Sequence, residues 1–211
     1  MKSHQPERFF ITGIAGKLET VLAKPSTSPK GIAIVTHPHP LYGGTMDNKV
    51  VHTLFNTFLE LGFITVKFNF RGVGQSEGVF DHGIGELADV LTVTRVIRER
   101  YTDLLHLPLL LSGFSFGGAI QLHAAQTLNP EFLILVAPSV VHLKAPAPPE
   151  RNHYALIIQG DQDDVVTPES ILAWAAPQSL PIVMIPGAGH FFHGKLLILK
   201  NLILRFFTPK M

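Results

Sequence analysis

The stretch LLLSGFSFGG, Leu109–Gly118, decides how the rest of the chain is interpreted. A short apolar run leads to Ser115, which stands between Gly113 and Gly117, and a helical pattern begins directly after it. This order predicts a buried strand that turns sharply into a helix and presents the Ser115 hydroxyl at the bend. Such a turn needs glycine on both sides, because side chains there would collide with the neighbouring strand and helix. We interpret Gly113–Gly117 as a G-x-S-x-G nucleophile elbow; the alternative is a Gly/Ser turn without chemistry.

Length and composition limit the classes of protein that this chain can form. Its 211 residues, 46% of them hydrophobic, are enough to bury a full core, and we expect one α/β domain spanning residues 1–211. A formal net charge of +1, with basic residues scattered along the chain, gives no reason to expect a nucleic-acid partner. The chain has no cysteine, which excludes disulfides, thiolate zinc sites and a cysteine nucleophile.

Targeting and membrane signals are the next features of the sequence. The first residues, Met1–Arg8, lack the apolar core of a signal peptide. No apolar run approaches the roughly 20 residues that a membrane-spanning helix needs. We therefore expect a cytoplasmic protein without stable membrane insertion.

Strand and helix patterns alternate along the chain. Apolar or alternating runs predict strands at Arg8–Thr12, Lys17–Ala23, Ile32–Thr36, Phe63–Phe70, Leu107–Phe114, Glu131–Ala137, Ala155–Gln159 and Pro181–Ile185. Helical spacing or caps predict helices from Val51 to Gly62, over Ile84–Tyr101 and Phe116–Leu128, from Thr167 onward, and over Lys195–Phe207. The alternation indicates a mostly parallel sheet with helices on both faces, and the first two strands form an antiparallel hairpin at its edge.

Two polar loops follow predicted strands after Ser115. The first, Gly160–Val166, contains three aspartates, and the second ends in His190. In a parallel sheet such loops meet at the carboxyl ends of the strands. A serine needs a base to take its proton and a carboxylate to orient that base, and the chain order Ser, Asp, His matches the α/β-hydrolase order. Of the eleven histidines, His190 is therefore the preferred base.

Several segments together resemble the α/β-hydrolase superfamily. The segments are His37–Lys49, Asn69–Gly78, Gly113–Gly117, Gly160–Val166 and Gly189–Gly194. The likeness runs from about Ile32 to Phe207 and is greatest to a small lidless branch of mostly uncharacterised bacterial serine hydrolases. The resemblance implies an α/β-hydrolase fold without a lid domain, and it makes Asp163 the acid of the triad, with Asp164 in reserve. We expect Arg71 and Ser76 to hold loops in place, with the arginine bonded to backbone carbonyls, and not to act in catalysis.

The segment His37-Pro38-His39-Pro40 allows two interpretations. Two histidines in the pattern H-x-H after a strand occur in some metal sites, but further ligands would be needed. The resemblance instead makes this the loop that supplies the second oxyanion donor. Because Pro38 and Pro40 have no N–H, the backbone N–H of His39 is the expected donor, with Leu41 next. The other donor is the N–H of Phe116 at the helix start.

The function that we predict from these features is hydrolysis of a small carboxylic ester or thioester through an acyl-enzyme on Ser115. No metal or cofactor is required. The short irregular segment Ser139–Arg151 lies where larger relatives carry a lid, which suggests an open site. A hydrolase-shaped binding protein without turnover and a peptide or amide hydrolase are the alternatives. The last helix is apolar nearly all round, so we expect core packing, with a homodimer as the alternative.

Overall fold

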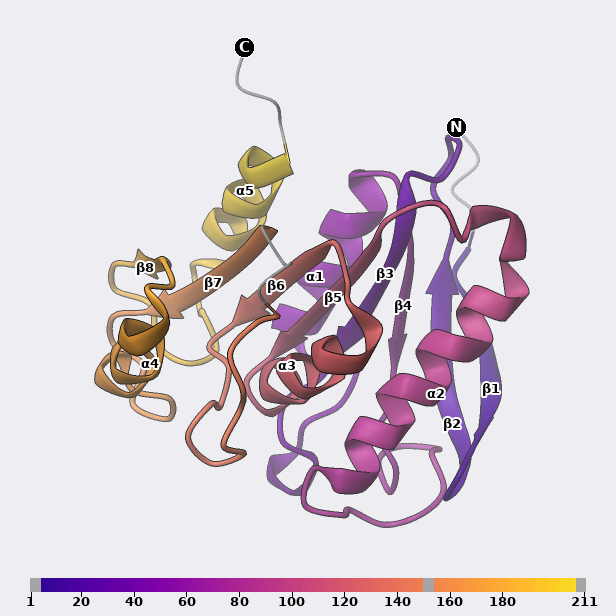
Figure 1. The fold of residues 1–211 in the computed structure, drawn as a ribbon, viewed down its shortest axis with the longest axis horizontal. Coiled ribbons are helices and arrows are strands. Elements are labelled where there is room, and N and C mark those ends of the chain that lie inside the picture. The colour runs from indigo at the N-terminus through magenta and orange to yellow at the C-terminus, as the bar shows by residue number, and fades with distance from the viewer. Residues whose placement is uncertain (1–4, 150–153, 208–211) are drawn as a thin grey trace.

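The computed structural model describes residues 5–149 and 154–207. Within these residues one eight-stranded sheet has the order β1-β2-β4-β3-β5-β6-β7-β8 (Figure 1). Neighbouring strands are parallel in the part of the sheet formed by β4, β3, β5, β6, β7 and β8. At the other edge, β1 pairs antiparallel with β2, and β2 pairs antiparallel with β4. The strand bounds are β1 Glu7–Gly13, β2 Gly16–Ala23, β3 Gly31–Thr36, β4 Phe63–Phe68, β5 Leu109–Phe114, β6 Phe132–Val136, β7 Tyr154–Gly160 and β8 Ile182–Ile185.

The helices form a layer on each face of the sheet. Their bounds are α1 Lys49–Glu60, α2 Ile84–Arg100, α3 Phe116–Leu128, α4 Pro168–Ala175 and α5 Leu196–Phe207, with short 3-10 turns at Pro40–Tyr42, Thr102–Leu104 and Ala176–Gln178. One apolar cluster joins α2, α3 and α4 to the sheet, and a second joins α1 and α5 to the opposite face. The predicted fold class, a mostly parallel sheet with an antiparallel N-terminal edge and helices on both faces, is therefore confirmed.

Burial explains why the central strands are continuous apolar runs. Every residue of β3, β4 and β5 is buried, because helices cover both faces of the sheet there. The strand β4 ends at Phe68, two residues earlier than the sequence predicts. At Asn69 the chain leaves the parallel ladder, and the Asn69 N–H donates to the Glu19 carbonyl oxygen at 2.9 Å.

The helix α5 is only partly covered. Leu199 and Ile203 are buried against the sheet, whereas Leu197 and Ile198 are 68% and 48% exposed. The expected core packing is confirmed for one face of the helix, and the homodimer stays a prediction. No helix in the described part of the chain has the length and apolar character needed to cross a bilayer.

The connection between β6 and β7 forms no lid helix over the residues that the structure describes. Residues 137–149 contain turns and irregular backbone, with neither helix nor strand. The end of the predicted irregular segment, at Arg151, lies outside the described residues. Ser115 follows the carboxyl end of β5, next to the loops that follow β3, β6, β7 and β8.

Candidate active site

Ser115 occupies the sharp turn between β5 and α3. Its backbone has φ 55° and ψ −118°, a conformation that residues with a side chain rarely adopt. A Cβ on Gly113 would lie 2.5 Å from both the Gly117 backbone and the Thr36 hydroxyl, and a Cβ on Gly117 would lie 2.5 Å from the His37 carbonyl oxygen. The two glycines therefore allow α3 to start directly against β3, and this contact holds Ser115 at the bend.

The structure brings Ser115, His190 and Asp163 together from three loops. The Ser115 Oγ lies 3.0 Å from His190 Nε2, and His190 Nδ1 lies 2.8 Å from Asp163 Oδ2. All three side chains are at least nine-tenths buried. The Phe114 ring packs against the imidazole with a centroid distance of 4.9 Å. The arrangement has the geometry of a hydroxyl, a base and an orienting carboxylate.

Asp163 is the aspartate of the acid loop that faces the histidine. Burial by itself would raise its pKa, but hydrogen bonds from His190 and from the N–H groups of Val165 and Val166 hold the pKa of this carboxyl below its ordinary value. Asp161 instead accepts a hydrogen bond from the Gly187 N–H at 2.6 Å and joins the two loops. Asp164 is exposed. Of the three aspartates, the one that the resemblance indicated is the one in contact with His190.

Two backbone N–H groups near Ser115 make no hydrogen bond within the described residues. Across residues 5–149 and 154–207, neither the His39 nor the Phe116 N–H has a hydrogen-bond acceptor. The Leu41 N–H, the other predicted candidate, donates to the Nδ1 of His39 at 3.2 Å and is therefore occupied. The loop after β3 passes over the start of α3, where the rings of His39 and Phe116 are 4.9 Å apart. Of the two N–H groups that the sequence indicated in this loop, that of Leu41 is occupied and that of His39 is not.

His37 holds this loop in its conformation. Its Nε2 accepts a hydrogen bond from the Phe70 N–H at 3.0 Å, which leaves the proton on Nδ1, and Nδ1 donates to the Pro38 carbonyl oxygen at 2.7 Å. A trans peptide directs its C=O and N–H in opposite directions, so the His39 N–H points away from the His37 ring. Burial lowers the pKa of His37 to about 4.

The metal interpretation of this segment has no support in the geometry. Both ring nitrogens of His37 are engaged by the backbone, and Nδ1 of His39 accepts from the Leu41 N–H. In the part of the chain that the structure describes, no three His, Asp or Glu side chains are grouped so that they could hold a metal ion.

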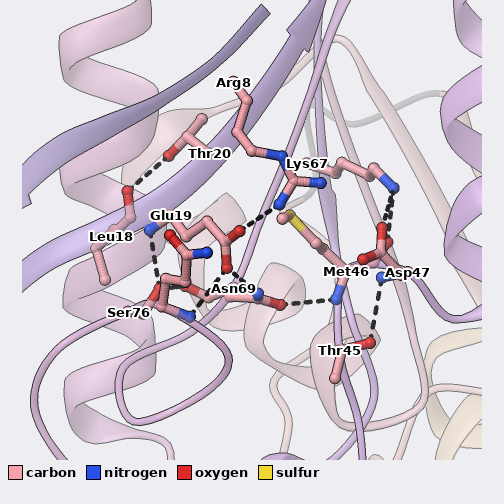
Figure 2. Close-up of polar contacts among 11 residues, drawn as sticks. Arg8, Leu18, Glu19, Thr20, Thr45, Met46, Asp47, Lys67, Asn69 and Ser76 are labelled. Carbon is pink, nitrogen blue, oxygen red and sulfur yellow. Dashed lines mark hydrogen bonds and ion pairs between the residues drawn. The ribbon is translucent and has the colours of Figure 1, made fainter. Parts of the chain in front are cut away.

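Buried polar side chains on β2 and β4 fasten the far end of the same loop (Figure 2). Lys67 Nζ donates to the Met46 carbonyl oxygen at 3.0 Å and to Asp47 Oδ1 at 2.8 Å, while Asn69 Oδ1 accepts from the Met46 N–H at 2.8 Å. Asn69 Nδ2 then donates to Glu19, which also pairs with Arg8. The positioning roles of these side chains were not predicted from the sequence. The sequence feature that could have indicated them was a lysine and a glutamate, each within a strand that is otherwise largely apolar.

Arg71 and Ser76 hold loops in place, as expected, but Arg71 does so through a carboxylate and not through backbone carbonyls. Ser76 Oγ donates to the Asn69 carbonyl oxygen at 2.7 Å and accepts from the Glu19 N–H at 2.9 Å. Arg71 contacts a carboxylate: Nη2 lies 2.7 Å from Asp89 Oδ1, and the Arg71 N–H donates to Oδ2. This buried pair fastens the loop after β4 to α2.

Two hollows flank Ser115. One, of about 470 Å³, lies between the loops after β3, β4 and β6, and its wall includes Phe116 and His39. The other, of about 210 Å³, lies beside the acid loop, and its wall includes Val166 and Thr167. Ser139, whose N–H donates to the Ser115 carbonyl oxygen, borders both. Both hollows therefore lie close to the turn that carries Ser115, one along Phe116 and the other along the acid loop.

Comparison with known proteins gives matches that agree with this geometry. A family model described as serine aminopeptidase, S33, matches residues 28–158. A solved α/β serine hydrolase homologue from Coxiella burnetii is 40% identical, with a TM-score of 0.89 over 99% of this chain and 100% of that chain. A solved serine hydrolase without a lid from Xanthomonas campestris is 34% identical, with a TM-score of 0.87 over 100% of this chain and 99% of that chain. An uncharacterised protein of Rickettsia prowazekii is 30% identical, over 89% of this chain and 83% of the relative.

Proposed function

The chain belongs to the lidless α/β serine hydrolases, in the family described as serine aminopeptidase, S33, and we propose that it hydrolyses carboxylic esters or thioesters through an acyl-enzyme on Ser115. The observation that carries the proposal is the 3.0 Å contact between Ser115 Oγ and His190 Nε2, with Asp163 bonded to the far side of the imidazole. The alternative of a binding protein without turnover gives no reason for a hydroxyl, an imidazole and a carboxylate to be buried in contact.

The proposed reaction has two halves. In the first, His190 Nε2 takes the Ser115 proton as Oγ attacks the acyl carbon, and the same proton then passes to the leaving oxygen or sulfur. Asp163 holds the proton on Nδ1 of His190 and stabilises the imidazolium. In the second half, His190 activates a water that hydrolyses the acyl-enzyme. The N–H groups of Phe116 and His39 stabilise the negative oxygen in both halves.

Amide cleavage is the second candidate, since the matching family is described as a serine aminopeptidase. An aminopeptidase must bind a charged α-amino group, for which a carboxylate is the usual partner. Among the described residues that line the two hollows beside Ser115 there is no aspartate or glutamate. This composition favours an uncharged acyl group and therefore an ester or thioester substrate.

The test compares three substrates on the wild-type protein and Ser115→Ala. We expect hydrolysis of p-nitrophenyl acetate and of an acetyl thioester, little release of p-nitroaniline from an aminoacyl p-nitroanilide, and none of these activities in Ser115→Ala. A fluorophosphonate probe should label Ser115 in the wild type only. Absence of both labelling and turnover would overturn the enzyme proposal, and preference for the anilide would replace the esterase by an aminopeptidase.

A further inference from the structure

The larger hollow beside Ser115 is walled by aromatic rings. The ring of His39 lies 4.9 Å from that of Phe116, 5.0 Å from Phe80 and 4.6 Å from Tyr42, measured between centroids. The ring of Phe80 lies 5.0 Å from that of His82. All five rings line the hollow of about 470 Å³. They come from two loops, after β3 and after β4, and from the start of α3.

The remaining wall is apolar or neutral. Leu41, Leu143, Ser139 and His142 complete the lining, and among the described residues no carboxylate, lysine or arginine contributes to it. Burial lowers the pKa of His39 below its ordinary value, so at neutral pH this ring is an uncharged aromatic surface. The hollow therefore offers flat π-faces with a few polar groups, and no carboxylate, lysine or arginine to pair with an ionic substrate group.

The position of the base decides which part of a substrate enters this hollow. In the proposed reaction the leaving oxygen must come within reach of His190 Nε2 to receive its proton. Asp163 bonds His190 and also the N–H of Val166, and Val166 lines the smaller hollow. In the proposed reaction the N–H groups of Phe116 and His39 hold the acyl oxygen, and both residues line the larger hollow, so the leaving group is directed away from it, toward the acid loop. The acyl group then extends to the other side, past Phe116 and His39, into the ring-lined hollow.

We propose that this hollow is an acyl-binding pocket for aryl-substituted carboxylic acids, such as arylalkanoic esters. The inference rests on the proposed function and deepens it by naming the substrate class. Aromatic rings attract one another in edge-to-face and offset arrangements beyond the effect of buried area. A cyclohexyl ring of similar size has more apolar surface and no π-face. A pocket that selects only for hydrophobicity should therefore prefer cyclohexyl, and this pocket should prefer phenyl.

The experiment uses pairs of esters that differ only in aromaticity. p-Nitrophenyl 3-phenylpropanoate and p-nitrophenyl 3-cyclohexylpropanoate share a leaving group, and their rings are too far from the carbonyl to alter its reactivity. We expect kcat/KM for the phenyl ester to exceed that for the cyclohexyl ester by about tenfold, which corresponds to two ring contacts. In the second pair, benzyl acetate and cyclohexylmethyl acetate, the ring is in the alcohol. For this second pair we expect the ratio of the two kcat/KM values to be near one.

Two variants test whether the aromatic rings that line the hollow cause the preference for the phenyl ester. Tyr42→Leu and Phe80→Leu each remove one ring, and Tyr42 is 86% exposed, so its replacement does not threaten folding. Each should reduce the phenyl-to-cyclohexyl ratio by about threefold or more. Phe10→Leu is the matched control, because this half-exposed phenylalanine on β1 lies outside the hollow, and it should leave the ratio unchanged.

The outcomes separate this inference from the proposed function. If the protein hydrolyses p-nitrophenyl acetate but prefers the cyclohexyl acyl ester or shows equal rates, the aryl pocket is wrong and the esterase proposal survives. If the aromatic preference is in the alcohol pair instead, the hollow binds the leaving group and our assignment of its contents is overturned. If no ester is hydrolysed and Ser115 is not labelled, the proposed function itself fails.

Discussion

The loops after β3 and after β8 each carry a buried histidine at the same edge of the sheet, and the two histidines have different partners. His37 is fully buried between the Phe70 N–H and the Pro38 carbonyl oxygen, neither of which can exchange a proton with it. His190 is 5% exposed and lies between the Asp163 carboxylate and the Ser115 hydroxyl. Backbone partners hold one imidazole in place, whereas the other has the carboxylate and hydroxyl partners that the proposed proton transfer requires.

The comparison shows that burial does not assign a role to a histidine. Both rings have both nitrogens engaged, and both are shielded from water. What differs is whether a charged imidazolium would have a carboxylate beside it. At His190 the Asp163 carboxylate is in hydrogen-bond contact, whereas His37 has no acidic hydrogen-bond partner among the described residues, and burial lowers its pKa to about 4.

The largest expected difference between the two loops is in turnover. His190→Ala removes the proposed base, and we expect kcat for p-nitrophenyl acetate to fall by about 10⁵-fold or more. His193→Ala is the matched control, because this exposed histidine lies three positions along the same loop and should keep activity within about twofold. Steady-state kinetics on both variants decides the matter. Comparable losses in both would mean that the loop, and not the His190 imidazole, is required.

The next effect distinguishes two adjacent aspartates. Asp163→Asn would present an amide to Nδ1 of His190 and favour the wrong tautomer, so we expect kcat to fall by about 10⁴-fold. Asp164→Asn changes an exposed carboxylate with no contact to His190, and kcat should stay within about twofold. Measuring both variants with the same ester tests the choice between the two residues. A larger loss in Asp164→Asn would contradict it.

A smaller effect is expected in stability as a function of pH. The unfolded pKa of a histidine is about 6.5, and burial lowers the pKa of His37 to about 4 in the folded protein. Between these values the unfolded chain binds a proton that the folded protein does not. The free energy of unfolding should therefore decrease as the pH falls from about 6.5 to about 4, by about 3 kcal/mol from His37 alone.

His37→Gln tests this pH dependence, because glutamine keeps a donor and an acceptor but does not titrate. Urea unfolding at pH 7, 5.5 and 4.5 should show a weaker pH dependence in this variant than in the wild type. Parallel stability curves for the two proteins would falsify the assignment of this transition to His37.

The smallest expected effect is on the alignment of the oxyanion donor. His37→Leu removes the bonds to the Phe70 N–H and the Pro38 carbonyl oxygen, and the His39 N–H is then no longer held toward the site. We expect kcat to fall between about tenfold and a hundredfold with little change in KM, since removing an oxyanion donor outright costs about 10²–10³. His37→Gln should restore much of the rate. A change in KM alone would contradict a positioning role.

The elbow and the positions of the strands along the chain could be predicted because their causes are local. Gly113 and Gly117 are required by a turn that the chain makes within five residues, and the apolar runs of β3 and β5 follow from burial on both faces. Asp163 needed the family resemblance, because three aspartates in one loop look alike until one of them faces a base. The lysine and glutamate on β4 and β2 could not be assigned to the oxyanion loop, since their partners are distant in the chain.

The sequence by itself determined the fold class, the candidate nucleophile and the order of the three polar residues, because short-range sterics and hydrophobic periodicity specify them. Only the tertiary structure decided which groups meet. His190 contacts Ser115 across 75 positions of the chain, and Phe70 contacts His37 across 33. The two free N–H groups and the ring-lined hollow likewise arise where separate loops converge. Such contacts depend on the packing of the whole sheet, so they cannot be predicted from a local sequence pattern.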